Sequence, residues 1–546
     1  MGFAKGAFTQ PALNIPSQHT EVKKRWHDGS VKFAVAYGVG SGEIAVKEGV
    51  NTQTAISQDL TDISISIDGV DIKLERFEQG VIESRYRALH DDLLVLLTVR
   101  QWADGTRWAR FAVENGYVNK ATQTKEYKAV VTIGDEVLNQ VILHDPHTRW
   151  IADGWIGEHA IAYQDIDYLK STGLVPNYIA SDAVPPGSYQ SYSVGEIGNH
   201  TKGMGAGGYQ YQIGLLPGWD ASYLASGSKE AYQSVIANAK AIGSYPIAWR
   251  DYDTLEQIDL DKFNQWTVSG YKQGGANQVC STAGCWERAH FPSTGYLAYL
   301  LTGDPVHLDT LAHTAALCYL IQNWGYGGGL GKERLSLGQT RGQAWCWRSI
   351  GMYTALTDDQ DFNDMLSFNF ARFAQDIDKN EIGVTYIGNI SAYGRGVIAP
   401  WMQNFRVQVL GFLSDIEPVD GMTDLIALRD HNYKFTVGLL GCFDTAGSYT
   451  LRAGPENTAS IADIWTWGEI NPSECGNEIT RPTATSYWAN MLPAISYAVD
   501  HKADGAESAW QRLSNAINFN QFQAGFKLNP VWGVFPRLDK TGGGEW

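Results

Sequence analysis

Apolar positions in the first ~140 residues follow the pattern of β-strands. Four runs rich in β-forming residues, 31–37, 63–67, 93–99 and 127–133, are separated by Asp-Gly and Gly turns. Trp26-His-Asp-Gly-Ser30 and Trp102-Ala-Asp-Gly-Thr106 each lead into a strand and echo one another, as two related hairpins would. The pattern predicts an all-β, barrel-like domain over residues 1–143.

From about residue 220 onward, apolar positions recur with the spacing of α-helices. The 306–323 stretch is apolar around much of its circumference, so neighbours must cover it on several sides. Helix pairs joined by loops of Gly, Trp and polar residues predict an α/α toroid over 221–525, with a cleft at the inner-helix ends. A plain helical bundle with a β cap is the alternative. The expected helices are 228–242, 293–302, 306–323, 341–356, 360–376, 400–414, 421–440, 483–500 and 505–519.

Two segments lack clear periodicity. Residues 144–220 are dense in Gly, Pro, Tyr and Trp, and such a long irregular stretch is expected to line a functional cleft. Residues 526–546 carry Pro and Gly punctuation and are expected to form a C-terminal arm. The predicted fold class is therefore α+β multidomain, a β-barrel-like domain followed by a helical toroid.

Composition and net charge limit the classes of partner that the chain is expected to bind. The chain has 546 residues with 44% hydrophobic and 18% charged positions, which indicates a globular protein. Its formal net charge of −17 argues against nucleic acid and anionic membranes as partners. An acidic polysaccharide would also be repelled at long range, so binding one requires locally concentrated arginines.

Cysteine usage and the N-terminus bear on localisation. Cys280 and Cys285 could close a small disulfide loop, and no C-x-x-C pair suggests zinc or redox chemistry. Met1-Gly-Phe-Ala-Lys-Gly6 has no apolar core, so no signal peptide is expected. No stretch has the length and hydropathy of a membrane span. We expect cytoplasmic synthesis.

The stretch from Cys285 to Arg348 carries the strongest chemical signal. If Thr340 caps a helix, then Arg341, Trp345 and Arg348 fall on one helix face. Guanidinium groups flanking an indole suit a sugar ring that bears a carboxylate. The alternative is a helix whose arginines pair with acids on neighbouring elements.

A polysaccharide lyase is the function that these residues favour. β-Elimination needs a cation for the uronate carboxylate, a base for the C5 proton and an acid for the leaving oxygen. Arg341 and Arg348 could supply the cation. The alternative for His290 is a loop residue that caps the next helix. The remaining assignments are His290 or Tyr296 as base, Tyr211 or Tyr163 as acid, Glu287 as a further catalytic group, and Trp286, Trp345, Tyr163, Tyr209 and Trp219 as sugar-binding residues. Aromatic packing is the alternative for the tyrosines and tryptophans.

A glycoside hydrolase is the second enzymatic hypothesis, because it needs two carboxylates that flank the glycosidic bond. Its candidates are Glu287, Glu158, Asp182 and Asp251, each of which could instead pair with an arginine. Metal chemistry is weaker: Glu287-x-x-His290 occurs once where a di-iron site needs two copies. The loop residues His144 and His147 could bind a structural divalent cation. No cofactor is expected.

Two groups of motifs resemble a known family. Trp26-His-Asp-Gly-Ser-Val-Lys-Phe33 resembles the strand signature in the N-terminal RIFT-type β-barrel of exo-rhamnogalacturonan lyase-like proteins. His290-Phe-Pro-Ser-Thr-Gly-Tyr296, Tyr299-Leu-Leu-Thr-Gly-Asp304 and Gln339-Thr-Arg-Gly-Gln-Ala-Trp-Cys-Trp-Arg348 look like the toroid behind such barrels. Large phage- and prophage-encoded proteins share this layout.

The resemblance implies architecture more firmly than activity. It implies a polysaccharide or cell-surface glycan as partner, and for the phage-encoded proteins a place in the virion or tail among other virion proteins. A virion or surface protein of the same layout that binds glycan without catalysis is therefore the rival hypothesis. The sequence leaves homo-oligomer formation open.

Overall fold

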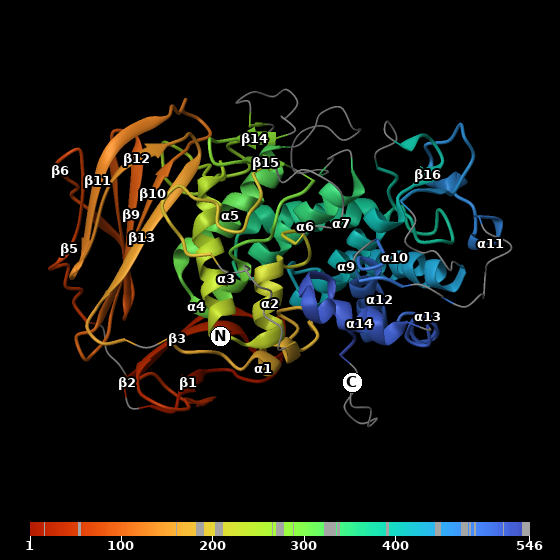
Figure 1. Cartoon of the computed structure of the whole chain (residues 1–546), viewed down its shortest axis with the longest axis horizontal. Coiled ribbons are helices and arrows are strands. Elements are labelled where there is room, and N and C mark those ends of the chain that lie inside the picture. The colour runs from red at the N-terminus through yellow and green to blue at the C-terminus, as the bar shows by residue number, and fades with distance from the viewer. Residues whose placement is uncertain are drawn as a thin grey trace.

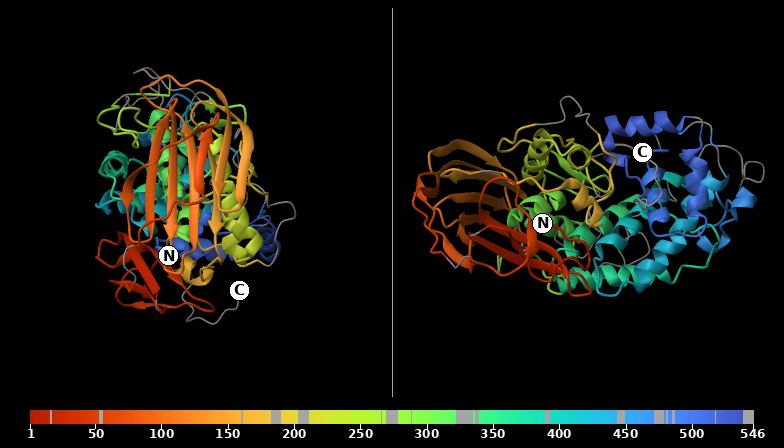
Figure 2. Two further views of the ribbon diagram at one scale, coloured as in Figure 1. Left: turned by 90° about the vertical axis from the view of Figure 1, so that its left-hand side faces the viewer. Right: turned by 90° about the horizontal axis from the view of Figure 1, so that it is seen from below.

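The computed structural model describes the chain except for residues 16, 53–55, 160, 182–189, 203–210, 265, 269–277, 288, 322–334, 336–338, 389–392, 443–448, 471–478, 480–481, 485–486, 517 and 538–546. Strands and helices occupy different parts of the molecule: the long strands lie on the left in Figure 1, and the helices fill the middle and right. Figure 2 shows the strands running side by side with the helices behind them. The predicted α+β multidomain class is confirmed at this level.

Two antiparallel sheets form the β-domain. One has the strand order β13-β10-β9-β8-β7 and the other the order β12-β11-β5-β6. Their bounds are β5 Ile63–Ile67, β6 Val70–Asp71, β7 Glu75–Gln79, β8 Glu83–His90, β9 Leu93–Gln101, β10 Arg107–Asn115, β11 Lys125–Ile133, β12 Glu136–His144 and β13 Thr148–Ile156. Alternate residues such as Ile65, Leu97, Phe111 and Val131 meet in one apolar core between the sheets. Among the described residues no strand pairing joins the two sheets, so barrel closure stays a prediction.

Strand β13 extends this domain past the expected boundary at residue 143. It pairs with β10 along its whole length, with Trp150 opposite Val113, and the Trp150 side chain enters the core. Asp145-Pro146-His147 reverses the chain between β12 and β13 and does not begin a new domain. Part of the segment expected to be irregular is therefore a strand.

A smaller β region connects the domain to the helices. It contains β1 Pro11–Leu13 paired with β4 Val46–Glu48, and β2 Ser17–Arg25 paired with β3 Val31–Val39. Trp26 lies buried in the turn between β2 and β3, and the Lys32 ammonium lies over its ring. Lys32 also donates to the backbone carbonyl of Glu417, at the end of a helix. The Trp-His-Asp-Gly-Ser motif thus holds a helix terminus.

The helical part contains the nine helices that the apolar spacing predicted. They are α3 Lys229–Ala241, α4 Tyr296–Thr302, α5 Pro305–Leu320, α6 Thr340–Thr354, α7 Gln360–Ala374, α9 Pro400–Ile416, α10 Thr423–Cys442, α12 Met491–Asp500 and α13 Ala506–Ser514. The sequence missed α1 Ile166–Ser171, α2 Gly218–Ser226, α11 Trp467–Ile470 and α14 Phe519–Leu528. Asp304 and Asp359 cap α5 and α7 through their side chains. Thr340 is the first residue of α6 and not its cap, which is Gln339.

The helices pack in sequence: α6 contacts α5, α7 and α9, and α9 contacts α10 and α12. Every residue of α6 is buried, because neighbours cover it on all sides. The 3-10 turn Pro530–Trp532 packs against α2, and Val534 bridges to Tyr178. The last described residues thereby lie beside the first helices of the chain.

Charged side chains join the two parts of the molecule. Arg110 of β10 forms ion pairs with Asp304, the α5 cap, and with Asp153 of β13. Glu114, four residues along β10, accepts from Arg250 and from His313 of α5. All of these groups except Asp153 are almost fully buried, so each charge depends on its partner.

Residues 526–537 do not form the extended arm that was expected from residue 526; residues 538–546 lie outside the described part of the chain. Phe526 belongs to α14 and is buried among aromatic side chains. Arg537 donates to Asp415 at 2.6 Å and to the carbonyl of Val175 at 3.1 Å. The apolar residues that precede the Pro and Gly positions pack in the core. The Pro and Gly positions alone had suggested an extended arm.

Within the described parts of the chain, none of the helices combines the length and apolar character that crossing a membrane requires.

Candidate functional site

A short hairpin and the turn after it bring Glu287 and His290 together. Strand β14 (Gln278–Cys280) pairs with β15 (Cys285–Glu287), and Cys280 and Cys285 form a disulfide across the pair. Glu287 Oε2 accepts from the backbone N–H of Ala289 at 2.9 Å and from Nδ1 of His290. This bond holds the proton on Nδ1, which leaves the lone pair on Nε2. Nε2 is buried and lacks a hydrogen-bond partner among the described residues.

Arg341 lies at the first turn of α6. Its Nε donates to Gln339 Oε1 at 2.8 Å, and its guanidinium lies over the Trp401 ring at 5.0 Å from the centroid. Its Nη nitrogens make no hydrogen bond or ion pair with any described residue. Burial lowers the pKa of Arg341, and the nearby charge of Glu287 opposes that shift. Arg341 therefore has two donor nitrogens to offer a ligand, within the electrostatic reach of the Glu287–His290 pair.

Aromatic side chains extend the site beyond Arg341. Trp401, at the start of α9, stacks with Tyr449 at 5.8 Å and with Tyr487 at 5.3 Å between ring centroids. The hydroxyls of Tyr449 and Tyr393 lie 3.0 Å apart. Tyr449 is 48% exposed. We call Trp401, Tyr393, Tyr449 and Tyr487 the aromatic wall; Trp401 is 1% exposed and supports the tyrosines, and tyrosine rings of this kind bind the apolar faces of sugars.

Three residues that were expected to contact the sugar are buried inside the protein. Trp286, Trp345 and Arg348 are at most 1% exposed. Arg348 Nη1 donates to the Gly214 carbonyl and Nη2 to that of Phe291 at 2.9 Å, and burial lowers its pKa to about 9. The expectation of one open helix face was wrong for Trp345 and Arg348, because α6 is covered all round.

These buried residues nevertheless connect the parts of the site. Phe291 stacks on Trp286 and lies under Arg348, and Arg348 lies over Trp345. Trp345 in turn packs on Phe405, which contacts Trp401. A continuous row of aromatic and cationic groups thus supports both the His290 turn and Arg341.

The predicted tyrosines occupy other places. The Tyr296 hydroxyl is fully buried and donates to the Leu174 carbonyl at 2.8 Å, so it is not available as a base. Tyr211 packs on Gly218, with its hydroxyl 3.1 Å from Ser222 Oγ. Trp219 is fully buried beside His200. Tyr163 is 40% exposed and contacts Tyr232 of α3, and Tyr209 lies outside the described residues.

The carboxylates proposed for a hydrolase do not form a described pair. Glu158 is exposed just after β13. Asp251 is buried and accepts from Lys262 at 2.6 Å and from Asn119 at 2.9 Å, which is a structural role. Asp182 lies outside the described residues. Of the three described carboxylates, only Glu287 lies in the site.

The aromatic wall was missed by the sequence interpretation. Trp401 follows Ala399-Pro400 at a helix start, whereas Tyr449 and Tyr487 come from segments outside helices and strands. The one available signal was the position of Trp401 at the N-terminus of a helix that packs beside α6. That position puts it at the same end of the helix pair as Arg341.

The histidines considered for a cation both have structural partners. His144 is buried between Tyr127 and the Thr148 carbonyl, and burial lowers its pKa to about 4. His147 stacks on Trp249 at 3.5 Å. Across the described residues, no group of three or more His, Cys, Asp or Glu side chains is arranged to hold a metal ion.

Comparison of the chain with family models, with curated proteins and with solved structures finds no match. The geometry of the site is therefore the basis for its function.

Proposed function

We propose that the protein is a carbohydrate-active enzyme, a polysaccharide lyase that cleaves an acidic glycan by β-elimination. The observation that carries the proposal is Arg341, whose Nη nitrogens have no partner among the described residues and lie beside the aromatic wall and near the Glu287–His290 pair. A uronate needs such a cation, because neutralising its carboxylate makes the C5 proton removable.

Each step has a residue in the site. Arg341 binds the C6 carboxylate through its Nη donors. His290 Nε2 takes the C5 proton while Glu287 stabilises the imidazolium through Nδ1. The bond between C4 and the leaving oxygen then breaks, and a double bond forms between C4 and C5. Burial beside Tyr449 raises the pKa of Tyr487, so its hydroxyl stays protonated and is suited to protonate the leaving oxygen.

The architecture belongs to the same proposal. The helix contacts run from α5 through α6 and α9 to α12, and the 3-10 turn Pro530–Trp532 near the C-terminus packs against α2; we propose that this arrangement is an α/α toroid. The two antiparallel sheets of the β-domain are the part of the chain that would form the expected RIFT-type barrel. Both the toroid and the resemblance to exo-rhamnogalacturonan lyase-like proteins are part of what we propose.

A non-catalytic virion or surface protein that binds glycan is the rival proposal. The burial of Trp286, Trp345 and Trp219 favours it, because these rings act in packing. Disulfides at Cys280–Cys285 and at Cys442 are typical of proteins in oxidising surroundings, which suits action outside the cell under either proposal.

Incubation with a panel of acidic glycans, followed by ultraviolet absorbance of the unsaturated product, tests the lyase. We expect His290→Gln to lower the rate by about 10²- to 10⁴-fold, the usual contribution of a general base. Arg341→Met should lower the rate as strongly and also weaken binding. His501→Gln is the matched control, because His501 is likewise bonded to a carboxylate, that of Asp415, but lies among other residues.

Equal loss in the His501→Gln variant would show that disturbed folding, and not lost chemistry, explains the effect. Binding of glycans without any unsaturated product across the panel would favour the non-catalytic proposal. Saturated fragments with a new reducing end would favour hydrolysis.

A further inference from the structure

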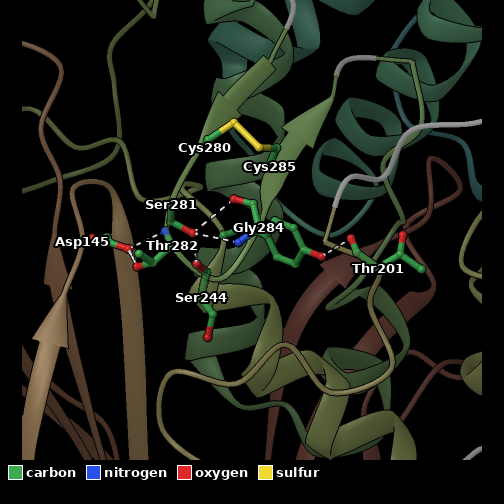
Figure 3. Close-up of a disulfide and its surroundings, with 9 residues drawn as sticks. Asp145, Thr201, Ser244, Cys280, Ser281, Thr282, Gly284 and Cys285 are labelled. Carbon is green, nitrogen blue, oxygen red and sulfur yellow. Dashed lines mark hydrogen bonds between the residues drawn. A yellow bond between two sulfur atoms is a disulfide. The ribbon is translucent and has the colours of Figure 1, made fainter.

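The hairpin that carries Glu287 is fixed at several points, and its disulfide is the covalent one. Figure 3 shows the disulfide bridging the two strands above the turn formed by Ser281, Thr282 and Gly284. Within the turn, the Ser281 N–H donates to the Gly284 carbonyl at 2.8 Å. In the strand register, Cys280 lies opposite Cys285 and Gln278 lies opposite Glu287.

The turn is also bound to the surrounding protein. The Thr282 N–H donates to Asp145, which follows β12, at 2.6 Å, and Ser281 Oγ donates to the Ser244 carbonyl at 2.8 Å. A Cβ added to Gly284 would come within 2.6 Å of the Tyr245 ring, so only glycine fits there. The turn of the hairpin is therefore held against both the β-domain and the segment that follows α3.

Toward its other end the hairpin is held through β15, where the Cys285 N–H donates to the Lys202 carbonyl at 2.7 Å and the buried Trp286 ring stacks on Phe291. The pairing of β14 and β15 comprises three residues on each strand, and a two-stranded pairing this short is not stable by itself. Glu287 is the last residue of β15, and its side chain sets the orientation of the His290 ring. The disulfide lies between the anchored turn and this functional end.

The disulfide contributes little to the free energy of unfolding of the whole chain. The two cysteines are five positions apart in sequence, and a cross-link over so short a loop constrains the unfolded chain far less than a long one does. A local role accounts better for a covalent bond two residues before Glu287.

We propose that the Cys280–Cys285 disulfide is a positioning element that holds Glu287 in place to orient His290, so that the oxidised form of the chain is the active one. This inference rests on the proposed function. Opening the disulfide lets β14 and β15 separate, and His290 then loses the fixed acceptor at Nδ1.

The test compares the wild-type chain with the C280S/C285S double variant and with Glu287→Gln. Histidine ring signals are followed by nuclear magnetic resonance on protein labelled with ¹³C-histidine, with His290 assigned from its absence in His290→Gln. We expect the His290 signal and its pH titration in C280S/C285S to move toward those of Glu287→Gln. With an acidic glycan that is turned over, kcat should fall by up to about 100-fold, the effect of a misplacement of about 1 Å, while KM changes little.

A reductant supplies the matched control, because the chain has a further disulfide at Cys442. Reduction of the wild-type chain should reproduce the spectrum of C280S/C285S, and reduction of the double variant should change the His290 signal no further. A His290 signal in C280S/C285S equal to that of the wild-type chain would overturn the inference. The expected spectral change without turnover of any glycan would support the positioning role and refute the proposed function, so the two failures are distinguishable.

Discussion

Arg250 binds the buried carboxylate of Glu114 with two nitrogens, Nε to Oε2 and Nη2 to Oε1, the latter at 3.2 Å. Glu114 comes from β10, and Arg250 comes from the segment that precedes the hairpin of the candidate site. Burial alone would raise the pKa of Glu114, but Arg250 and His313 outweigh it and hold the pKa well below the usual value of 4.5. The pair thus fixes the β-domain against the helices.

We expect Glu114→Gln to lower the free energy of unfolding by about 3–5 kcal/mol, because buried Arg250 loses the nearer of its two carboxylate partners and keeps only Asp309. Urea denaturation followed by circular dichroism measures this. Glu456→Gln, which removes the exposed ion pair with Arg452, should change it by less than about 1 kcal/mol. Since the folded pKa of Glu114 is depressed, its contribution is present above pH 4.5 and lost as pH falls. A similar effect of the two substitutions would contradict the structural role.

Substitution of Asp220, in the first turn of α2, should raise stability, whereas substitution of Glu114 should lower it. Asp220 is almost fully buried, and burial alone raises its pKa well above the usual value of 3.8, with no ion-pair partner among the described residues. The native state therefore holds its proton where the unfolded state does not, so this group makes stability fall as pH rises above about 3.8. Asp220→Asn should raise the melting temperature at pH 7 and flatten that part of the pH profile. A lower melting temperature would show that the carboxyl has a stabilising partner.

Tyr449 offers a direct test of the aromatic wall. Because this ring is exposed and stacks on Trp401, Tyr449→Ala should leave the melting temperature nearly unchanged. It should weaken the affinity for an acidic oligosaccharide by roughly 2- to 10-fold, the value of one aromatic contact. Tyr168→Ala, at a similarly exposed tyrosine on α1, is the matched control for calorimetry. Equal affinities in both variants would place the glycan elsewhere.

Arg537 should matter for stability as much as the buried pairs do. Its partner Asp415 is largely buried, with 13% of its side chain exposed, and also accepts from His501 at 2.9 Å. Burial raises the pKa of the Asp415 carboxyl, yet Arg537 and His501 hold it below its usual value. Arg537→Met should lower the free energy of unfolding by about 3 kcal/mol or more. Limited proteolysis should then cut near residues 170–178 sooner than in the wild-type chain.

The sequence predicted the elements whose signals are local. The 360–376 pattern gave α7 to within two residues, because Asp359 caps an amphipathic stripe. Helix α2 was missed, because Pro217-Gly218 looks like a turn and every residue but the last is buried, which leaves no polar face. Strand β13 was hidden behind Asp145-Pro146, which only reverses the chain.

The candidate site was predicted in part for the same reason. Glu287 and His290 are three residues apart, and their contact follows from a local turn. The different surroundings of the two buried arginines could not be predicted, since they depend on how neighbouring helices pack over α6: Arg348 donates to two backbone carbonyls, whereas the Nη nitrogens of Arg341 have no partner among the described residues. The aromatic wall joins Trp401, Tyr449 and Tyr487 from distant segments, and such tertiary proximity leaves no periodic trace in one sequence.

The anchoring of Arg537 against Lys170 and Val175 has a consequence for biosynthesis. A nascent chain reaches residue 175 long before residue 537 leaves the ribosome, so the early helices wait for their last neighbour. Final assembly of the helical part therefore requires the synthesis of residue 537, and a chain cut short before that residue would expose its apolar interior to chaperones and proteases.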